Sequence, residues 1–146
     1  MQKGPIPIRA GALEGVTHGF FGREGGVSTG AVAGLQIGQG AGDDPAAVEE
    51  NRARVIAALS PGATLVLPYQ VHSADAAIVT APMADEDRPR VDAFVTAAPG
   101  LLIGVVIADC APVLLADAQA GVVAAAHAGW RGAKGGVLAT TVEAMV

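Results

Sequence analysis

The chain has 146 residues, a length that fits one domain, and a formal net charge of −5. Because 51% of the residues are hydrophobic and only 16% are charged, the composition excludes a chain that is disordered throughout. The acidic balance and the absence of any run of Lys or Arg argue against nucleic acid as a partner.

The first third of the chain contains many glycines and predicts short strands and turns. A helix is predicted to begin at Pro45, because the side chain of Asp44 can cap free backbone N–H groups and Pro fits the first helical position. Apolar residues then recur on one helical face as far as Leu59, where a Ser-Pro-Gly turn follows. We expect this helix to have a structural role.

From residue 63 onward the pattern changes to short apolar runs closed by turns, which is typical of strands buried on both faces. The last two runs, separated by a turn that ends at Gly121, predict a hairpin. Beyond Arg131, apolar residues at helical spacing predict a terminal helix without a visible C-cap. Together the elements predict one domain, residues 1–146, with an α/β (α+β) sandwich fold in which helices flank a mixed sheet. The predicted strands cover residues 64–67, 76–80, 93–96, 101–107, 113–116 and 122–126.

The sequence also bears on where the protein works. Its single cysteine cannot form an internal disulfide, and the N-terminus lacks the apolar core of a signal peptide, so we expect a cytoplasmic setting. The longest uncharged stretch, residues 93–108, contains a Pro-Gly pair and is shorter than the roughly 20 apolar residues of a membrane span. We therefore expect no membrane partner. The oligomeric state is not predicted.

Three apolar runs each end in a residue that can bind a metal, and a turn follows directly. These residues are His72, Cys110 and His127. Structural zinc sites usually take paired ligands from one turn, whereas ligands drawn singly from separate strands suit a three-ligand site with an open position. A thiolate and two imidazoles are a good donor set for Zn²⁺, and copper is also chemically compatible. The pattern therefore predicts a catalytic metal site.

Each of these residues also has a simpler interpretation. A lone cysteine in an apolar context is commonly a small buried residue, and either histidine could be a hydrogen-bonded core or surface residue. Cys110 and His127 could instead act as the nucleophile and general base of a hydrolase. Spacing and composition leave these interpretations open.

Five motifs, in the same order along the chain, closely resemble the family once called multicopper polyphenol oxidases or laccase-domain proteins, and the resemblance extends from about Thr17 to the end. It implies zinc-dependent phosphorolysis of adenosine, inosine and methylthioadenosine, together with adenosine deamination, so the implied partners are a purine nucleoside and phosphate. One branch of the family is linked to editing of peptidoglycan precursors. A fold kinship with deamidating bacterial toxins keeps a Cys-His hydrolase as an alternative. The motifs occupy residues 21–30, 42–45 with 50–52, 70–72, 108–115 and 127–132.

Carried over motif by motif, the family's metal ligands fall on His72, Cys110 and His127. The chain departs from the family in two respects. Residues 34–36 read Gly-Leu-Gln where the family usually has Ser-Leu-Asn, which would alter a polar contact near the substrate. Family members also continue well past the position of Val146, so the resemblance predicts a chain that is truncated at its C-terminus relative to the family.

Three arginines are candidates for binding phosphate: Arg23, Arg52 and Arg131. Arg131 is placed where a helix is predicted to begin, and free N–H groups at a helix start favour a negative ligand. The simpler interpretation of each arginine is a surface ion pair.

Asp109 is a candidate general acid, or a residue that orients a ligand histidine, or a turn former. Trp130 could stack on a purine, although a lone Trp is more often part of a core, and His18 is expected to be structural. With zinc in place, deamination would proceed by attack of an activated water molecule on C6 of adenine. Phosphorolysis would instead polarise the purine as the leaving group.

Overall fold

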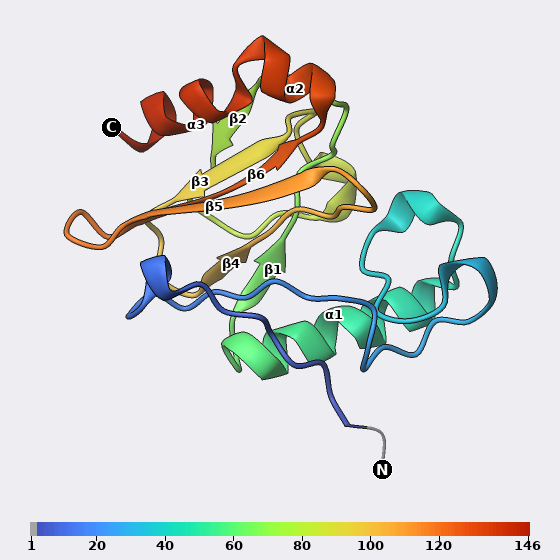
Figure 1. Ribbon diagram of the computed structural model, residues 1–146. Coiled ribbons are helices and arrows are strands. Elements are labelled where there is room, and N and C mark those ends of the chain that lie inside the picture. The colour runs from blue at the N-terminus through green and yellow to red at the C-terminus, as the bar shows by residue number, and fades with distance from the viewer. Residues whose placement is uncertain (1–2) are drawn as a thin grey trace. The chain divides into compact units, whose positions relative to one another are not determined.

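The computed structural model describes residues 3–146, which divide into two compact units, one ending at Ala63 and one beginning at Thr64 (Figure 1). Short 3₁₀ helices cover Gly11–Leu13, Gly30–Val32, Gln39–Ala41 and Asp85–Asp87. The α-helices are α1 (Pro45–Leu59), α2 (Trp130–Gly135) and α3 (Val137–Met145). The strands are β1 (Thr64–Val66), β2 (Ala76–Ile78), β3 (Ala93–Thr96), β4 (Leu101–Ile103), β5 (Ala111–Asp117) and β6 (Val122–Ala128).

In the first unit, α1 begins where the sequence predicted. The carboxylate of Asp44 accepts a hydrogen bond from the backbone N–H of Ala46 at 3.1 Å, and Pro45 occupies the first turn. The remainder of the unit consists of loops joined by isolated β-bridges between Ile8 and Phe20 and between Ser28 and Gly34. The structural helix and the turns are confirmed, but the short strands predicted for the first third were wrong: its described residues form only isolated bridges and 3₁₀ helices between turns.

One residue of α1, Asn51, is fully buried and connects the glycine-rich loops to the helix. Its Oδ1 accepts from the N–H of Val27 at 2.8 Å. Its Nδ2 donates to the hydroxyl of Ser28 at 2.8 Å and to the carbonyl oxygens of Gln36 at 2.8 Å and Gly34 at 3.3 Å. These four hydrogen bonds give the loops a defined path across the helix.

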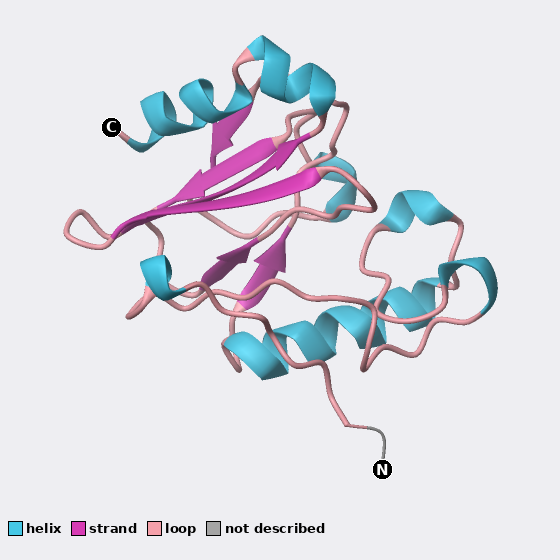
Figure 2. Ribbon diagram, in the orientation of Figure 1, coloured by secondary structure: helices cyan, strands magenta, loops and turns pink. Residues whose placement is uncertain are grey.

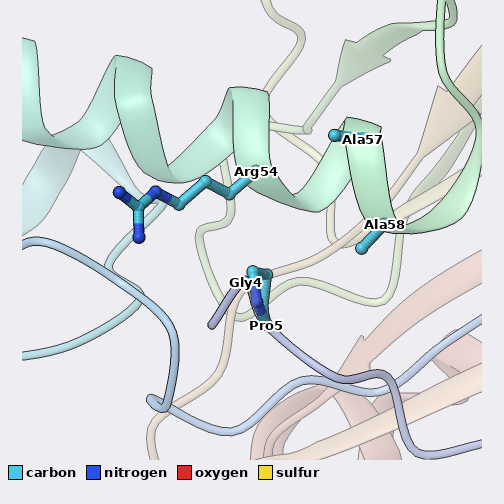
Figure 3. Close-up of a pocket in the computed structure, with 5 residues that line it drawn as sticks. All are labelled: Gly4, Pro5, Arg54, Ala57 and Ala58. Carbon is cyan, nitrogen blue, oxygen red and sulfur yellow. The ribbon is translucent and has the colours of Figure 1, made fainter. Parts of the chain in front are cut away.

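A shallow pocket of the first unit lies between the N-terminal segment and α1, as Figure 3 shows. Among the described residues that line it, the guanidinium of Arg54 is the only charged group. This group already donates to Glu50 at 2.8 Å and to the carbonyl oxygen of Gly25 at 2.9 Å. The lining residues are Gly4, Pro5, Arg54, Ala57 and Ala58. These described lining residues therefore supply no group with catalytic chemistry.

The second unit contains a four-stranded sheet with strand order β2-β3-β6-β5 (Figure 2). β2 and β3 are parallel, whereas β3 pairs with β6 and β6 with β5 in antiparallel fashion. β1 and β4 form a separate two-stranded parallel sheet. The mixed sheet and the β5–β6 hairpin were both predicted, and both predictions are confirmed.

Alternate residues of β3 face the two sides of the four-stranded sheet. Phe94 packs with Val66 of β1, so the two-stranded sheet covers one side. Its neighbour Ala93 packs with Ala126 of β6 and Val137 of α3, so α3 covers the other side. This sandwich of helices, sheet and sheet confirms the predicted α/β architecture. α3 and α2 pack against β6, and residues 124–127 of this strand are buried, which matters because β6 carries His127.

Three details differ from the sequence prediction. The apolar run 101–107 is a strand only as far as Ile103, because the segment beyond Gly104 is held by a side chain of another loop. The terminal helix is divided into α2 and α3 by Gly136, whose φ of 94° interrupts the helical backbone. β5 lies at an edge of its sheet and is only half-buried along most of its length, so the prediction of burial on both faces was wrong there.

Among residues 3–146, no helix is long and apolar enough to cross a membrane.

Candidate metal centre

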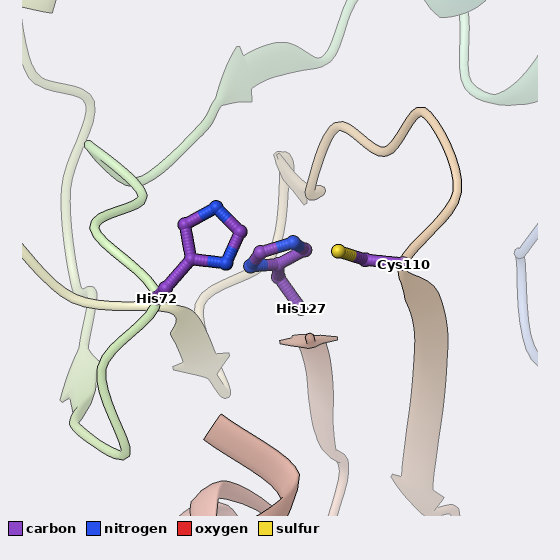
Figure 4. A group of neighbouring side chains, drawn as sticks. All are labelled: His72, Cys110 and His127. Carbon is purple, nitrogen blue, oxygen red and sulfur yellow. The ribbon is translucent and has the colours of Figure 1, made fainter. Parts of the chain in front are cut away.

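The three predicted metal ligands come together in the second unit (Figure 4). His72 lies in the loop between β1 and β2, Cys110 directly precedes β5, and His127 lies near the end of β6. The antiparallel register pairs Ala111 with Ala128, which brings Cys110 and His127 to the same end of the hairpin. One ligand atom from each of the three residues lies within 4.8 Å of the others. A single ion can therefore contact all three side chains.

The three side chains of the cluster differ in solvent exposure. His127 is buried, with 4% of its surface exposed, Cys110 is half-buried and His72 is exposed. The rings of His72 and His127 meet edge to face at 77°, with 4.8 Å between their centroids. The exposed side leaves a direction from which a small molecule can approach, as a catalytic site with an open position requires.

Asp92, a fully buried carboxylate directly before β3, was not predicted from the sequence. Its Oδ2 lies 2.7 Å from Nδ1 of His127. Burial raises the pKa of Asp92, but hydrogen bonds from the His127 ring, from Ser73 and from the Val71 backbone lower the pKa by more, so the net value lies below that of an ordinary carboxyl group. Asp92 is therefore ionised at neutral pH. The signal in the sequence was a lone acidic residue at the start of an apolar strand.

His72 has a left-handed backbone, with φ of 59°, and is the only residue other than glycine with a positive φ in the described part of the chain. Such a conformation costs a non-glycine residue on the order of 1 kcal/mol or more and persists only where surrounding contacts impose it. Here the N–H groups of Val71, His72 and Ser73 all donate to the carboxylate of Asp92. The strained backbone at a predicted ligand is consistent with a functional role.

A second side chain joins the His72 loop to the segment that leads to Cys110. The amide of Gln70 donates to the carbonyl oxygen of Val106 at 2.7 Å and accepts from the N–H of Val106 at 2.8 Å. The pair of hydrogen bonds reproduces one rung of a β-ladder where the strand β4 has ended. The Gln of the Gln-Val-His motif thus fixes the two ligand-bearing loops relative to each other.

Gly129 leaves space beside the ligand atoms. A Cβ built on this residue would lie 2.9 Å from Nδ1 of His72 and 3.2 Å from Sγ of Cys110. Any larger residue would therefore fill the position beside the nitrogen and sulfur that a metal ion needs. Together with the convergence of two imidazoles and a thiol, this space shows that the residues present fit a metal such as zinc.

We expect Gly129→Ala to weaken zinc binding by about 10- to 100-fold, the cost typical of disturbing a ligand shell without removing a ligand. The backbone of Gly129, with φ −69° and ψ 171°, is open to alanine, so the fold should persist. Competition with a chromogenic chelator measures the affinity. Gly40→Ala is the control, since a Cβ there meets nothing within 4 Å. Equal zinc affinity in both variants would contradict the placement of the ion.

The predicted catalytic residues are placed as follows. Asp109 is exposed, and its Oδ1 lies 4.0 Å from Sγ of Cys110. Arg131 is exposed in the first turn of α2, with its guanidinium 5.3 Å from the centre of the Trp130 ring. Arg23 is exposed in the first unit, and its role and that of Arg131 stay predictions. Trp130 is 72% exposed, so it does not belong to the core.

Two other polar residues named from the sequence have structural contacts. His18 is buried, with Nδ1 2.8 Å from the carbonyl oxygen of Val16 and Nε2 accepting from the N–H of Ala10 at 2.8 Å. Its predicted structural role agrees with these contacts. Nε of Arg52 donates to the carbonyl oxygen of Ile37 at 2.8 Å, which ties a loop to α1. The contact favours a structural role for Arg52 over phosphate binding.

Comparison with known proteins places the chain in a family. The family model described as multi-copper polyphenol oxidoreductase laccase matches residues 17–146. The chain belongs to this laccase family. The resemblance inferred from the five sequence motifs is thereby confirmed.

Laccase-family relatives with assigned names are similar over most of this chain. A purine nucleoside phosphorylase of Streptomyces coelicolor is 50% identical over 136 residues, which cover 91% of this chain and 55% of the relative. A purine nucleoside phosphorylase of Deinococcus radiodurans is 45% identical over 142 residues, covering 97% of this chain and 54% of the relative. The chain thus spans about half the length of the curated relatives it matches.

Solved laccase-family structures share the fold. YlmD from Geobacillus stearothermophilus has a TM-score of 0.80 and 35% identity, covering 92% of this chain and 53% of that chain. A Neisseria meningitidis protein has a TM-score of 0.73 and 43% identity, covering 84% of this chain and 49% of that chain. Both comparisons support the mixed α/β architecture described above.

Proposed function

We propose that the chain carries the metal centre of a zinc-dependent purine nucleoside phosphorylase that acts on inosine, adenosine and methylthioadenosine and also deaminates adenosine. The observation that carries the proposal is the convergence of His72, Cys110 and His127 within 4.8 Å, in a chain 50% identical to a protein named purine nucleoside phosphorylase. The names of the relatives support nucleoside and phosphate as substrates. The cytoplasmic location stays a prediction.

The donor set favours zinc over a cluster of copper ions. His72, His127 and Cys110 together supply two imidazole nitrogens and one thiolate, a borderline-soft set that suits Zn²⁺. The whole sequence contains three histidines, and one of them, His18, is engaged far along the chain in a loop contact. A multicopper oxidase needs several more histidines than remain. Oxidation of phenols by a copper cluster is therefore not proposed.

In phosphorolysis, the bond between the purine nitrogen and C1′ of the ribose breaks, a phosphate oxygen forms a new bond to C1′, and the purine leaves with a proton. When bound, zinc supplies a Lewis acid beside the substrate. His127, Cys110 and His72 would hold it. Asp109 is the candidate proton donor to the purine, a role that needs its carboxyl group in the protonated form, because this group is exposed beside Cys110. Arg131 and Arg23 are the candidates for holding phosphate.

A hydrolase that uses Cys110 and His127 as nucleophile and base is the second candidate. Its supporting observation is the presence of both side chains in one cluster. However, such a pair has no need of His72, whose strained backbone the protein maintains at a cost. The third converging ligand therefore favours the metal enzyme.

The test incubates the zinc-loaded chain with inosine, with and without inorganic phosphate, and measures hypoxanthine and ribose 1-phosphate. We expect both products in equal amounts, only when phosphate is present, and none after removal of the metal with a chelator. Adenosine should yield both adenine and inosine. Turnover that persists in chelator but is stopped by alkylation of Cys110 would reverse the proposal in favour of the hydrolase. Lack of any turnover would also count against it.

A further inference from the structure

The carboxylate of Asp92 lies at the centre of the hydrogen bonds that surround the metal ligands. It is fully buried and accepts from five donors without any counter-charge from Lys or Arg among the contacts that surround it. Oδ1 accepts from the N–H groups of Val71 and Ser73 at 3.1 and 2.7 Å and from the Ser73 hydroxyl at 2.8 Å. Oδ2 accepts from the N–H of His72 at 3.0 Å and is 2.7 Å from Nδ1 of His127.

The contact with His127 determines which ring nitrogen can bind a metal. A carboxylate surrounded by backbone N–H groups is an acceptor only, so the ring nitrogen that faces it must carry the proton. Nδ1 of His127 therefore donates to Asp92, and the lone pair of the neutral ring is on Nε2. A histidine with this pattern binds a metal through the nitrogen that faces away from the carboxylate.

The contacts with the loop act on the other histidine. Three consecutive N–H groups, those of Val71, His72 and Ser73, converge on one carboxylate, which forces the chain to curl around it. The left-handed backbone of His72 is the local consequence of this curl. Because the direction of the Cα–Cβ bond follows from the backbone, the same carboxylate sets the direction in which the side chain of His72 leaves the chain.

We propose that Asp92 is a positioning residue that orients both histidines of the metal centre, selecting the Nδ1-protonated form of His127 and imposing the left-handed backbone of His72. The inference rests on the metal centre of the proposed function, but not on the substrate or the reaction. One buried carboxylate thereby orients two histidines that come from separate parts of the chain, β6 and the loop after β1.

Asp92→Asn is the informative variant because the amide has the shape of the carboxylate but only one acceptor oxygen. With its NH₂ at the position of Oδ1, the amide would face two backbone N–H donors, those of Val71 and Ser73. With its NH₂ at the position of Oδ2, it would face one backbone donor and the ring of His127. The second orientation leaves fewer donors unpaired, so it should prevail. The NH₂ then donates to Nδ1 of His127, which moves the ring proton to Nε2.

The first measurement determines the protonated ring nitrogen of His127 in the metal-free wild-type chain, and the same measurement is then made on Asp92→Asn. Long-range ¹H–¹⁵N spectra at mildly alkaline pH report which nitrogen of each neutral histidine carries the proton, and the sequence has only three histidines to assign. We expect the proton of His127 on Nδ1 in the wild type and on Nε2 in Asp92→Asn. Zinc affinity, measured by chelator competition, should fall by about 10- to 100-fold in the variant.

Thr96→Val is the matched control. Thr96 is the last residue of β3, the strand that begins directly after Asp92. It is 2% exposed, and its hydroxyl donates to the carbonyl oxygen of Val79 at 2.7 Å. This variant also loses a buried hydrogen bond, so its stability should fall, but its zinc affinity and the His127 proton should stay as in the wild type. A loss of zinc affinity as large as that of Asp92→Asn would mean that Asp92 acts only through general stability.

Two further results would overturn the proposal. One is a wild-type His127 whose proton is on Nε2 in the metal-free chain, a result that stands even if Asp92→Asn does not fold. The other is unchanged zinc affinity in folded Asp92→Asn. Neither measurement involves a nucleoside, so failure of the proposed phosphorolysis would leave the role of Asp92 intact, and failure of the role of Asp92 would leave phosphorolysis open.

Discussion

Cys110→Ala is expected to abolish stoichiometric zinc binding. The cluster supplies three ligand atoms, and catalytic zinc sites hold the metal through three protein ligands with one open position. Removal of the thiolate leaves two imidazoles, one of them on an exposed residue, and takes away the strongest soft donor of the set. Elemental analysis after gel filtration should find about one zinc per wild-type chain and almost none in the variant.

The control for this prediction is Ala108→Ser, an exposed position in the same loop whose side chain is not among the ligands. It should retain zinc as the wild type does. Cys110→Ser should behave like Cys110→Ala, because a serine hydroxyl does not replace the soft sulfur donor of the set. Full zinc occupancy in Cys110→Ala would show that the metal binds elsewhere or that the cluster has another use.

Local signals predicted the elements well. The Asp-Pro pair at residues 44–45 marked the start of α1, and the turn ending at Gly121 marked the β5–β6 hairpin. Both signals act within a few residues, through a cap and a tight turn, so they can be found in one sequence. The end of β4 could not be found in this way, because what replaces the ladder is the side chain of Gln70, far away in the sequence.

The candidate site likewise contains residues that the sequence predicted and residues that only the tertiary structure shows. Its candidate ligands were predicted because imidazole and thiol groups are rare and recognisable, and the structure brings His72, Cys110 and His127 together. The residues that arrange them were not predicted. Asp92 has the appearance of an ordinary turn residue until three N–H groups and a ring are seen to converge on it. The importance of Gly129 depends on two atoms from other segments. Both are properties of tertiary structure.

A large loss of stability is expected from Asn51→Leu in the first unit. Asn51 is fully buried and makes four hydrogen bonds that no apolar residue can replace. Leucine has the same branched heavy-atom skeleton, with bulkier methyl groups, but leaves the N–H of Val27 and the carbonyl oxygen of Gln36 without these partners. Each unsatisfied buried group costs about 1–3 kcal/mol, so the free energy of unfolding should fall by about 4 kcal/mol. Urea unfolding measures this change, and hydrogen exchange at Val27 localises it.

Glu50→Gln is the control for this prediction, because it changes the neighbouring residue of the same helix. Glu50 is exposed and pairs with Arg54 at 2.8 Å, one helical turn away. An exposed pair of this kind contributes about 0.3–0.5 kcal/mol, so its loss should barely shift the urea midpoint. The difference in stability loss between Asn51→Leu and Glu50→Gln then separates the effect of the buried hydrogen bonds from any effect on the helix itself. A loss below about 1 kcal/mol in Asn51→Leu would mean that the loops find other partners for these groups, since that is the scale of one ordinary hydrogen bond.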